Sequence, residues 1–135
     1  MNATPHTLAG ITSLIIFKDN LAIGCAVATL SHLALDYINE NGLTFKERIY
    51  FDALPSLLLF VVSIFTGNFM LFLLGNIFGN LPDLIDKKLY LSIFLPVWFK
   101  STLFLHWQTP IINPSPVTTK IIGVISAILI LIILC

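Results

Sequence analysis

The longest apolar segment of the chain decides what kind of fold it can adopt. It runs from Ala53 to Leu81 and contains no Asp, Glu, Lys or Arg. At about 1.5 Å per residue, a helix of this length exceeds the roughly 30 Å hydrocarbon core of a bilayer. The segment therefore predicts a helical membrane protein.

The overall composition agrees with that prediction. Hydrophobic residues make up 57% of the 135 residues and charged residues 10%, whereas soluble domains carry about 25% charged residues. We expect an all-α, polytopic integral membrane protein of about four or five helical segments, including short or re-entrant ones, with residues 1–135 as one transmembrane domain. The seven basic and seven acidic residues give no net charge, so nothing in the charge indicates nucleic acid as a partner. The apolar composition makes the lipid bilayer the expected partner.

Breaks in the apolar pattern predict where the helical segments lie. Thr7–Phe17 suits a half-helix or re-entrant segment, and Leu21–Ile38 is the first predicted spanning helix. The polar stretch 39–52 is predicted to be a loop outside the membrane. A Gly-Asn pair at Gly67 divides the long apolar segment, which favours a helical hairpin over one tilted helix.

The last third of the chain contains three kinds of segment. Residues 89–107 are apolar but are divided by Pro96 and Lys100, so they suit a partly interfacial position. Residues 108–119 carry three prolines and are predicted to be extended or looped. From Ile121 onward the chain is apolar and contains no site-like residue, which predicts a lipid-facing terminal anchor.

The hairpin model gathers the basic residues on one side of the membrane. Four of them would share one face, against Lys18 alone on the other: Lys46, Arg48, Lys87 and Lys88. The positive-inside rule makes that face cytoplasmic. A single tilted helix would instead divide the basic residues evenly, so the charge pattern favours the hairpin.

Polar side chains collect at the ends of the predicted segments. His32 and Asp36 are four residues apart on one helix, so they share a face about 5 to 6 Å apart. Under the hairpin model, Asp83 and Asp86 follow a helix end on the same side of the membrane. Imidazole nitrogens and carboxylate oxygens together bind zinc, manganese or iron.

These side chains predict a divalent metal site. Its expected ligands are His6, His32, Asp36, Asp83 and His106. A water in an open position on such an ion is acidified toward neutrality, so hydrolysis of a lipid or another membrane-proximal ester is the expected chemistry. Asp86 is the expected catalytic residue, which would accept a proton from that water.

Four of the five predicted ligands also have a purely structural interpretation. A histidine in an apolar helix, such as His32, often joins helices by hydrogen bonds. Asp83 and Asp86 precede two lysines and suit a solvated helix end. His6 lies near the amino terminus and suits an exposed position, while His106 suits the membrane interface. Together they favour an alternative function, that of a non-catalytic helical scaffold or partner-binding protein. Transport of an ion or small solute is a third possible function.

Two further features bear on packing. Gly75–Gly79 reads GNIFG, a small-xxx-small motif that favours close helix contact, either within the chain or between copies in a homo-oligomer. Asp19 and Asp52 are interpreted as loop or helix-cap residues.

Three short motifs resemble those of one family, the membrane-bound metal-dependent hydrolases, which are small inner-membrane proteins of bacteria and archaea. The motifs are TPHTLAG, SHLALD and GNLPDLID. The resemblance implies a multi-pass protein of a prokaryotic plasma membrane, with His6, His32, Asp36 and Asp83 as metal ligands or their supports. The chain departs from the family where Asp83 and Asp86 are three residues apart instead of two, and where a histidine-rich stretch is replaced by FLHWQTP.

Overall fold

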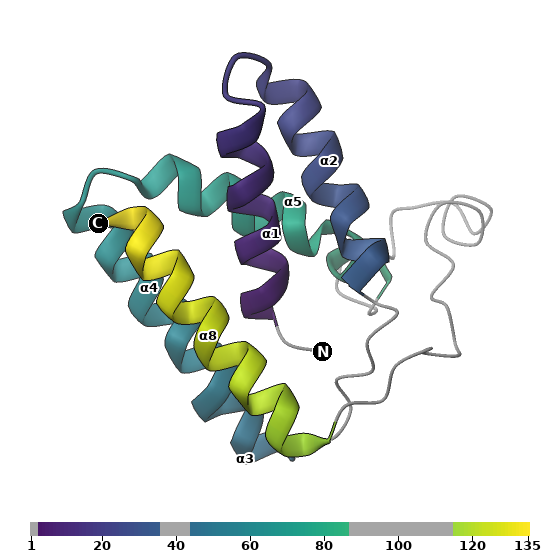
Figure 1. The fold of residues 1–135 in the computed structure, drawn as a ribbon, viewed down its shortest axis with the longest axis vertical. Helices are drawn as coiled ribbons and strands as arrows, with labels where there is room; N and C mark the ends of the chain where they lie inside the picture. The colour runs from purple at the N-terminus through teal and green to yellow at the C-terminus, as the bar shows by residue number, and fades with distance from the viewer. Residues whose placement is uncertain (1–2, 36–43, 87–114) are drawn as a thin grey trace.

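The computed structural model describes residues 3–35, 44–86 and 115–135 (Figure 1). All regular structure in these ranges is helical, which confirms the predicted all-α class. The helices are α1 (Ala3–Ile16), α2 (Leu21–Leu35), α3 (Phe45–Arg48), the π-helical turn η1 (Ile49–Ala53), α4 (Leu54–Phe65), α5 (Phe69–Asp86) and α8 (Pro116–Leu134).

Helices α1 and α2 form an antiparallel pair joined by a short loop (Figure 1). α1 begins at Ala3, four residues before the predicted segment. Asn20 caps the start of α2, because its Oδ1 accepts a hydrogen bond from Ile23 N across 3.2 Å. The described part of α2 ends at Leu35, so the last three residues of the predicted span Leu21–Ile38 lie outside the described residues.

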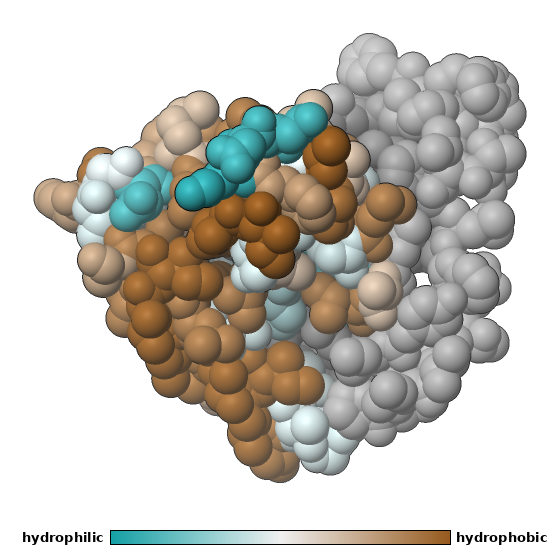
Figure 2. All heavy atoms as spheres, turned by 45° about the horizontal axis from the view of Figure 1, so that its top comes forward, coloured by the Kyte–Doolittle hydropathy of each residue, from teal (hydrophilic) through white to brown (hydrophobic). Residues whose placement is uncertain are grey.

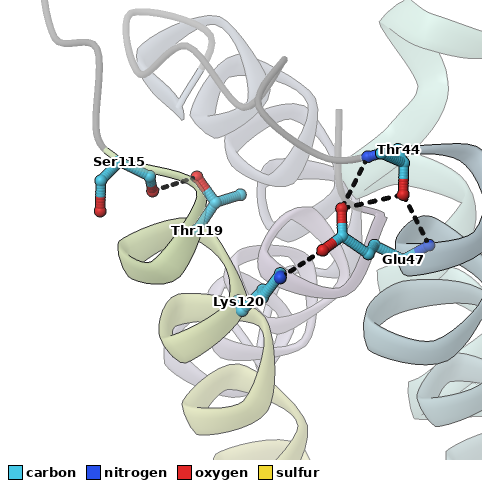
Figure 3. Close-up of polar contacts among 5 residues, drawn as sticks. All are labelled: Thr44, Glu47, Ser115, Thr119 and Lys120. Atoms are coloured by element: carbon cyan, nitrogen blue, oxygen red, sulfur yellow. Dashed lines mark hydrogen bonds and ion pairs between the residues drawn. The ribbon is translucent and has the colours of Figure 1, made fainter.

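The polar stretch predicted to be a loop is helical from Phe45 onward, so that part of the prediction was wrong. Thr44 and Glu47 form a capping box, in which each side chain bonds to the backbone N–H of the other (Figure 3). The helix then passes through η1, where Leu54 N donates to Ile49 O. Pro55 has no N–H for the ordinary i−4 bond, which explains a wider π-type turn at this point.

The predicted break in the long apolar segment is confirmed at Gly67. This residue has a φ of 75°, a left-handed conformation that costs glycine little, and it separates α4 from α5. The two arms diverge after the turn. Phe60 of α4 contacts Phe69 and Phe72 of α5 edge-on, but α5 then packs mainly against α1 and α2.

Replacing Gly67 with alanine is expected to lower the free energy of unfolding by about 1 kcal/mol, because a Cβ disfavours positive φ. No atom lies within 4 Å of the added Cβ, so backbone strain is the sole cost. Gly67→Asn should lose less, since Asn tolerates this conformation. Unfolding in mixed micelles with increasing SDS measures both variants, and equal losses would contradict the explanation.

Helix α8 begins at Pro116, which corrects the prediction that residues 108–119 are entirely extended or looped. Ser115 caps the helix by accepting a hydrogen bond from Thr118 N across 3.2 Å, and Pro116 occupies the first helical turn. Proline is favoured there because its missing N–H would have no intrahelical partner. Residues 108–114 lie outside the described residues.

Helices α4 and α8 run side by side in the same direction (Figure 1). At their N-terminal ends, Glu47 forms an ion pair with Lys120, whose Nζ also lies 5.5 Å from the centroid of the Phe51 ring (Figure 3). At the opposite ends, Asn68 Nδ2 donates to Leu134 O across 2.7 Å. These contacts fix the alignment of the two helices.

Within residues 3–35, 44–86 and 115–135, two helices are long and apolar enough to cross a membrane, by length and composition: Phe45–Phe65 and Pro116–Leu134. Each buries one face and exposes the rest. On α8, the buried face includes Thr119, Ser126 and Ile130, while large apolar side chains such as Ile132 are exposed. Figure 2 shows apolar residues over most of the described surface in view, with hydrophilic residues in small patches.

Candidate metal centre

Three of the predicted site residues meet where α1, α2 and α5 pack together. The rings of His6 and His32 stack with their centroids 4.1 Å apart and their planes at 29°. His32 Nε2 lies 3.7 Å from Asp83 Oδ1. Both histidines are buried, at 1% and 0% exposure, and the Asp83 side chain is 17% exposed. The structural interpretation of His6 as an exposed residue was therefore wrong.

Glycines bring the three helices close enough for these contacts. A Cβ on Gly75 would lie 2.8 Å from Ile11 N, and a Cβ on Gly79 would overlap the carbonyl of His6. Both glycines belong to the GNIFG motif, so the motif packs within the chain, against α1. Because a side chain on either glycine would push α1 away, the motif is what allows His6 to reach His32.

The orientation of His32 is set by the backbone of α5. His32 Nδ1 lies 2.8 Å from the carbonyl oxygen of Gly79. A carbonyl oxygen carries no hydrogen, so Nδ1 is the donor and holds a proton. In the neutral ring, Nε2 is then the basic nitrogen, and it is this atom that faces Asp83. His32 thus also joins α2 to α5, as its structural interpretation predicted.

A buried hydrogen-bond network lies beside the cluster and was missed from the sequence. Thr7 Oγ1 donates to Asn76 Oδ1 across 2.8 Å, and Asn80 Nδ2 donates to Asn76 Oδ1 across 3.0 Å. Asn80 Nδ2 also lies 3.2 Å from Thr7 Oγ1. The signal was present, because asparagines four residues apart share one helix face. The network holds α1 and α5 in one register, one residue along from His6.

Asp52 fixes the start of α1, as expected of a helix-cap residue. Its carboxylate accepts hydrogen bonds from Ala3 N, Thr4 N and Thr4 Oγ1 across 2.9, 2.8 and 2.8 Å. The first N–H groups of a helix have no intrahelical acceptor, so this carboxylate satisfies two of them. It thereby holds the turn that carries His6.

Two donor atoms of the cluster, His32 Nε2 and Asp83 Oδ1, have a spacing compatible with one divalent ion of the zinc, manganese or iron type. Two ligands on one zinc ion at about 2.0 to 2.1 Å lie about 3.3 Å apart in a tetrahedral site. The 3.7 Å between His32 Nε2 and Asp83 Oδ1 is close to that spacing and longer than a hydrogen bond. In metal-binding histidines, the ring nitrogen that does not bind the metal usually donates to a carboxylate, a backbone carbonyl or a water, as His32 Nδ1 does here to Gly79 O. Among the described residues, no group of three or more His, Cys, Asp or Glu side chains is placed to hold an ion.

Three predicted residues cannot be added to this geometry. Asp36 and His106 lie outside the described residues. Asp86 is the last residue of α5, and its side chain is likewise outside them. Their roles stay predictions from the sequence.

Comparisons of the chain with models of protein families, with curated proteins and with solved structures gave no match.

Proposed function

We propose that the protein is a multi-pass protein of a prokaryotic plasma membrane that binds a divalent metal ion and hydrolyses a lipid or another membrane-proximal ester. One observation carries the proposal: His32 Nε2 faces Asp83 Oδ1 at 3.7 Å while Nδ1 donates to Gly79. A basic nitrogen and a carboxylate oxygen directed at each other favour a cation between them. The motif resemblance supports the same activity.

The residues of the chain have distinct roles in this proposal. His32 and Asp83 hold the ion, and the His6 ring supports His32 by stacking on it. Asp36 and His106 complete the ligand set, and Asp86, three residues after Asp83, accepts the proton. A divalent ion held there supplies Lewis acidity for hydrolysis.

The proposed membrane orientation rests on the parallel alignment of α8 with the continuous helix formed by α3, η1 and α4. Lys46 and Arg48 lie in α3, at the N-terminal end of the continuous helix Phe45–Phe65, and the ion pair with Glu47 brings Lys120 to the same end. Lys18 lies beyond the other end of α1. The positive-inside rule therefore favours a cytoplasmic position for the end of the molecule that contains Lys46 and Lys120.

The scaffold function is the competing candidate, and the buried network of Thr7, Asn76 and Asn80 favours it. In a scaffold, a protonated His32 would form an ion pair with Asp83 and join α2 to α5 without a metal. The two functions therefore differ in what lies between Nε2 and Oδ1.

Metal binding by the purified protein in detergent distinguishes them. We expect one zinc, manganese or iron ion per chain by elemental analysis, and one cobalt ion per chain by calorimetry with cobalt as the probe. His32→Asn should lower the affinity at least tenfold, because the shorter amide can still donate to Gly79 O but cannot replace Nε2. Asp83→Asn should do the same by removing the anionic oxygen.

Ser63→Ala is the matched control for these variants. Ser63 is also buried in a helix, but its hydroxyl bonds to Phe60 O and does not contact the cluster, so metal affinity should not change. Hydrolysis of a nitrophenyl ester and a nitrophenyl phosphodiester, with and without EDTA, tests the reaction class. Absence of bound metal in the wild-type protein, or equal affinity in all variants, would favour the scaffold.

A further inference from the structure

Gly79 is the point at which the three helices of the cluster meet. Its carbonyl oxygen lies 2.8 Å from His32 Nδ1 on α2. On the other side, the position of its missing Cβ lies 2.9 Å from the carbonyl carbon of His6 and 3.5 Å from Gly10 Cα, both on α1. Asp83 follows four residues later in the same helix, on the same face. Gly79 therefore contacts both histidines and lies on the same helix face as Asp83.

The carbonyl of Gly79 decides which nitrogen of His32 is basic. A helical carbonyl oxygen has a second lone pair, which can accept from a side chain in addition to the helix ladder. Pro82 lies three residues later inside α5, and a proline in a helix interior opens the preceding turn because it lacks an N–H and its ring crowds the i−4 carbonyl.

The missing side chain of Gly79 decides how close α1 comes. Any Cβ there would overlap the His6 carbonyl, and the overlap is with backbone atoms that no rotamer change can move. The centroids of the His6 and His32 rings are 4.1 Å apart, and separation of α1 from α5 would increase this distance. The same residue thus controls ring stacking on one side and ring orientation on the other.

We propose that Gly79 is the positioning residue of the metal centre: its carbonyl holds His32 in the Nδ1–H form, with Nε2 directed at Asp83, and its lack of a side chain admits His6. This inference rests on the proposed function in so far as it concerns metal affinity. The control of the His32 tautomer does not depend on the metal.

Gly79→Ala and Gly75→Ala form a matched pair of variants. Both add one methyl group to the α1–α5 crossing, but a Cβ on Gly75 would meet Ile11 and not a histidine. We expect Gly79→Ala to weaken cobalt binding at least tenfold, by analogy with the loss of other outer-shell partners of metal ligands. Gly75→Ala should weaken binding less, because its Cβ meets α1 at Ile11, five residues from His6. Equal affinities in the two variants would overturn the positioning role.

The tautomer is read directly from ¹H–¹⁵N correlation spectra of the histidine rings in detergent, with His32→Asn used to assign the signals. Wild-type protein should show His32 protonated at Nδ1, and an Nε2–H form would overturn the proposal even if neither glycine variant folds. If His32 is protonated at Nδ1 but the wild-type protein binds no cobalt, the proposed function fails while control of the tautomer by Gly79 stands.

Discussion

Replacing Gly10 with alanine is expected to lower the free energy of unfolding by about 2 to 3 kcal/mol, a large effect for one methyl group. A Cβ on Gly10 would overlap the carbonyl oxygen of Gly75 and would lie 2.9 Å from its carbonyl carbon. Both helices would have to move apart, because the atoms in contact belong to the backbone. Unfolding in mixed micelles with increasing SDS measures the loss.

Gly24→Ala is the matched control for this prediction. Gly24 is also a buried helical glycine, but its added Cβ would lie 3.2 Å from Leu14 Cδ2, at the end of a flexible side chain. Alanine in a helix interior gains about 1 kcal/mol over glycine, which should offset much of that contact. A Gly10→Ala variant as stable as Gly24→Ala would show that α1 and α5 do not cross this closely.

Replacing Asp52 with alanine is expected to cost about 2 kcal/mol of stability, because hydrogen bonds to a carboxylate are stronger than neutral ones and three would be lost. The donors Ala3 N, Thr4 N and Thr4 Oγ1 lie 2.8 to 2.9 Å from the Asp52 oxygens. The first turn of α1 should then fray, and His6 lies within two residues of Thr4. Thermal unfolding in detergent measures the stability, and hydrogen exchange of α1 measures the fraying.

Two variants test whether the lost hydrogen bonds are the cause. Asp52→Asn keeps one acceptor oxygen and should lose less stability than Asp52→Ala. Asp19→Ala removes a carboxylate that is exposed in the loop after α1, and it should leave both measurements unchanged. Faster exchange throughout the molecule in Asp52→Ala, and not at the start of α1 first, would contradict this local explanation.

The sequence predicted the break at Gly67 and named the three residues that form the cluster because both depend on local patterns. A Gly-Asn pair in an apolar run favours a turn whatever surrounds it, and three of the six predicted site residues come together. Two helix starts were missed although their caps are visible in the sequence. Thr44 precedes Glu47 by three residues, and Ser115 precedes a proline, but high polarity and proline content favoured loops.

The burial of His6 could not be predicted from local patterns. It depends on Gly79, more than seventy residues away in the chain, which lets α1 lie directly on α5. The Thr7–Asn76 hydrogen bond was missed for the same reason. A small-xxx-small motif predicts that some helix will pack closely, but it does not say which helix or whether that helix belongs to the same chain.

The parallel alignment of α4 and α8 has an electrostatic consequence. Each helix carries a partial positive charge at its N-terminus and a partial negative charge at its C-terminus, so two parallel neighbours place like charges side by side. Glu47 supplies a carboxylate where the two positive ends adjoin, and Asn68 supplies an N–H donor where the two negative ends adjoin. The energies of these charge interactions are larger in a low-dielectric bilayer than in water. The direction in which α8 lies against α4 therefore depends on two polar side chains that lie outside the cluster of His6, His32 and Asp83.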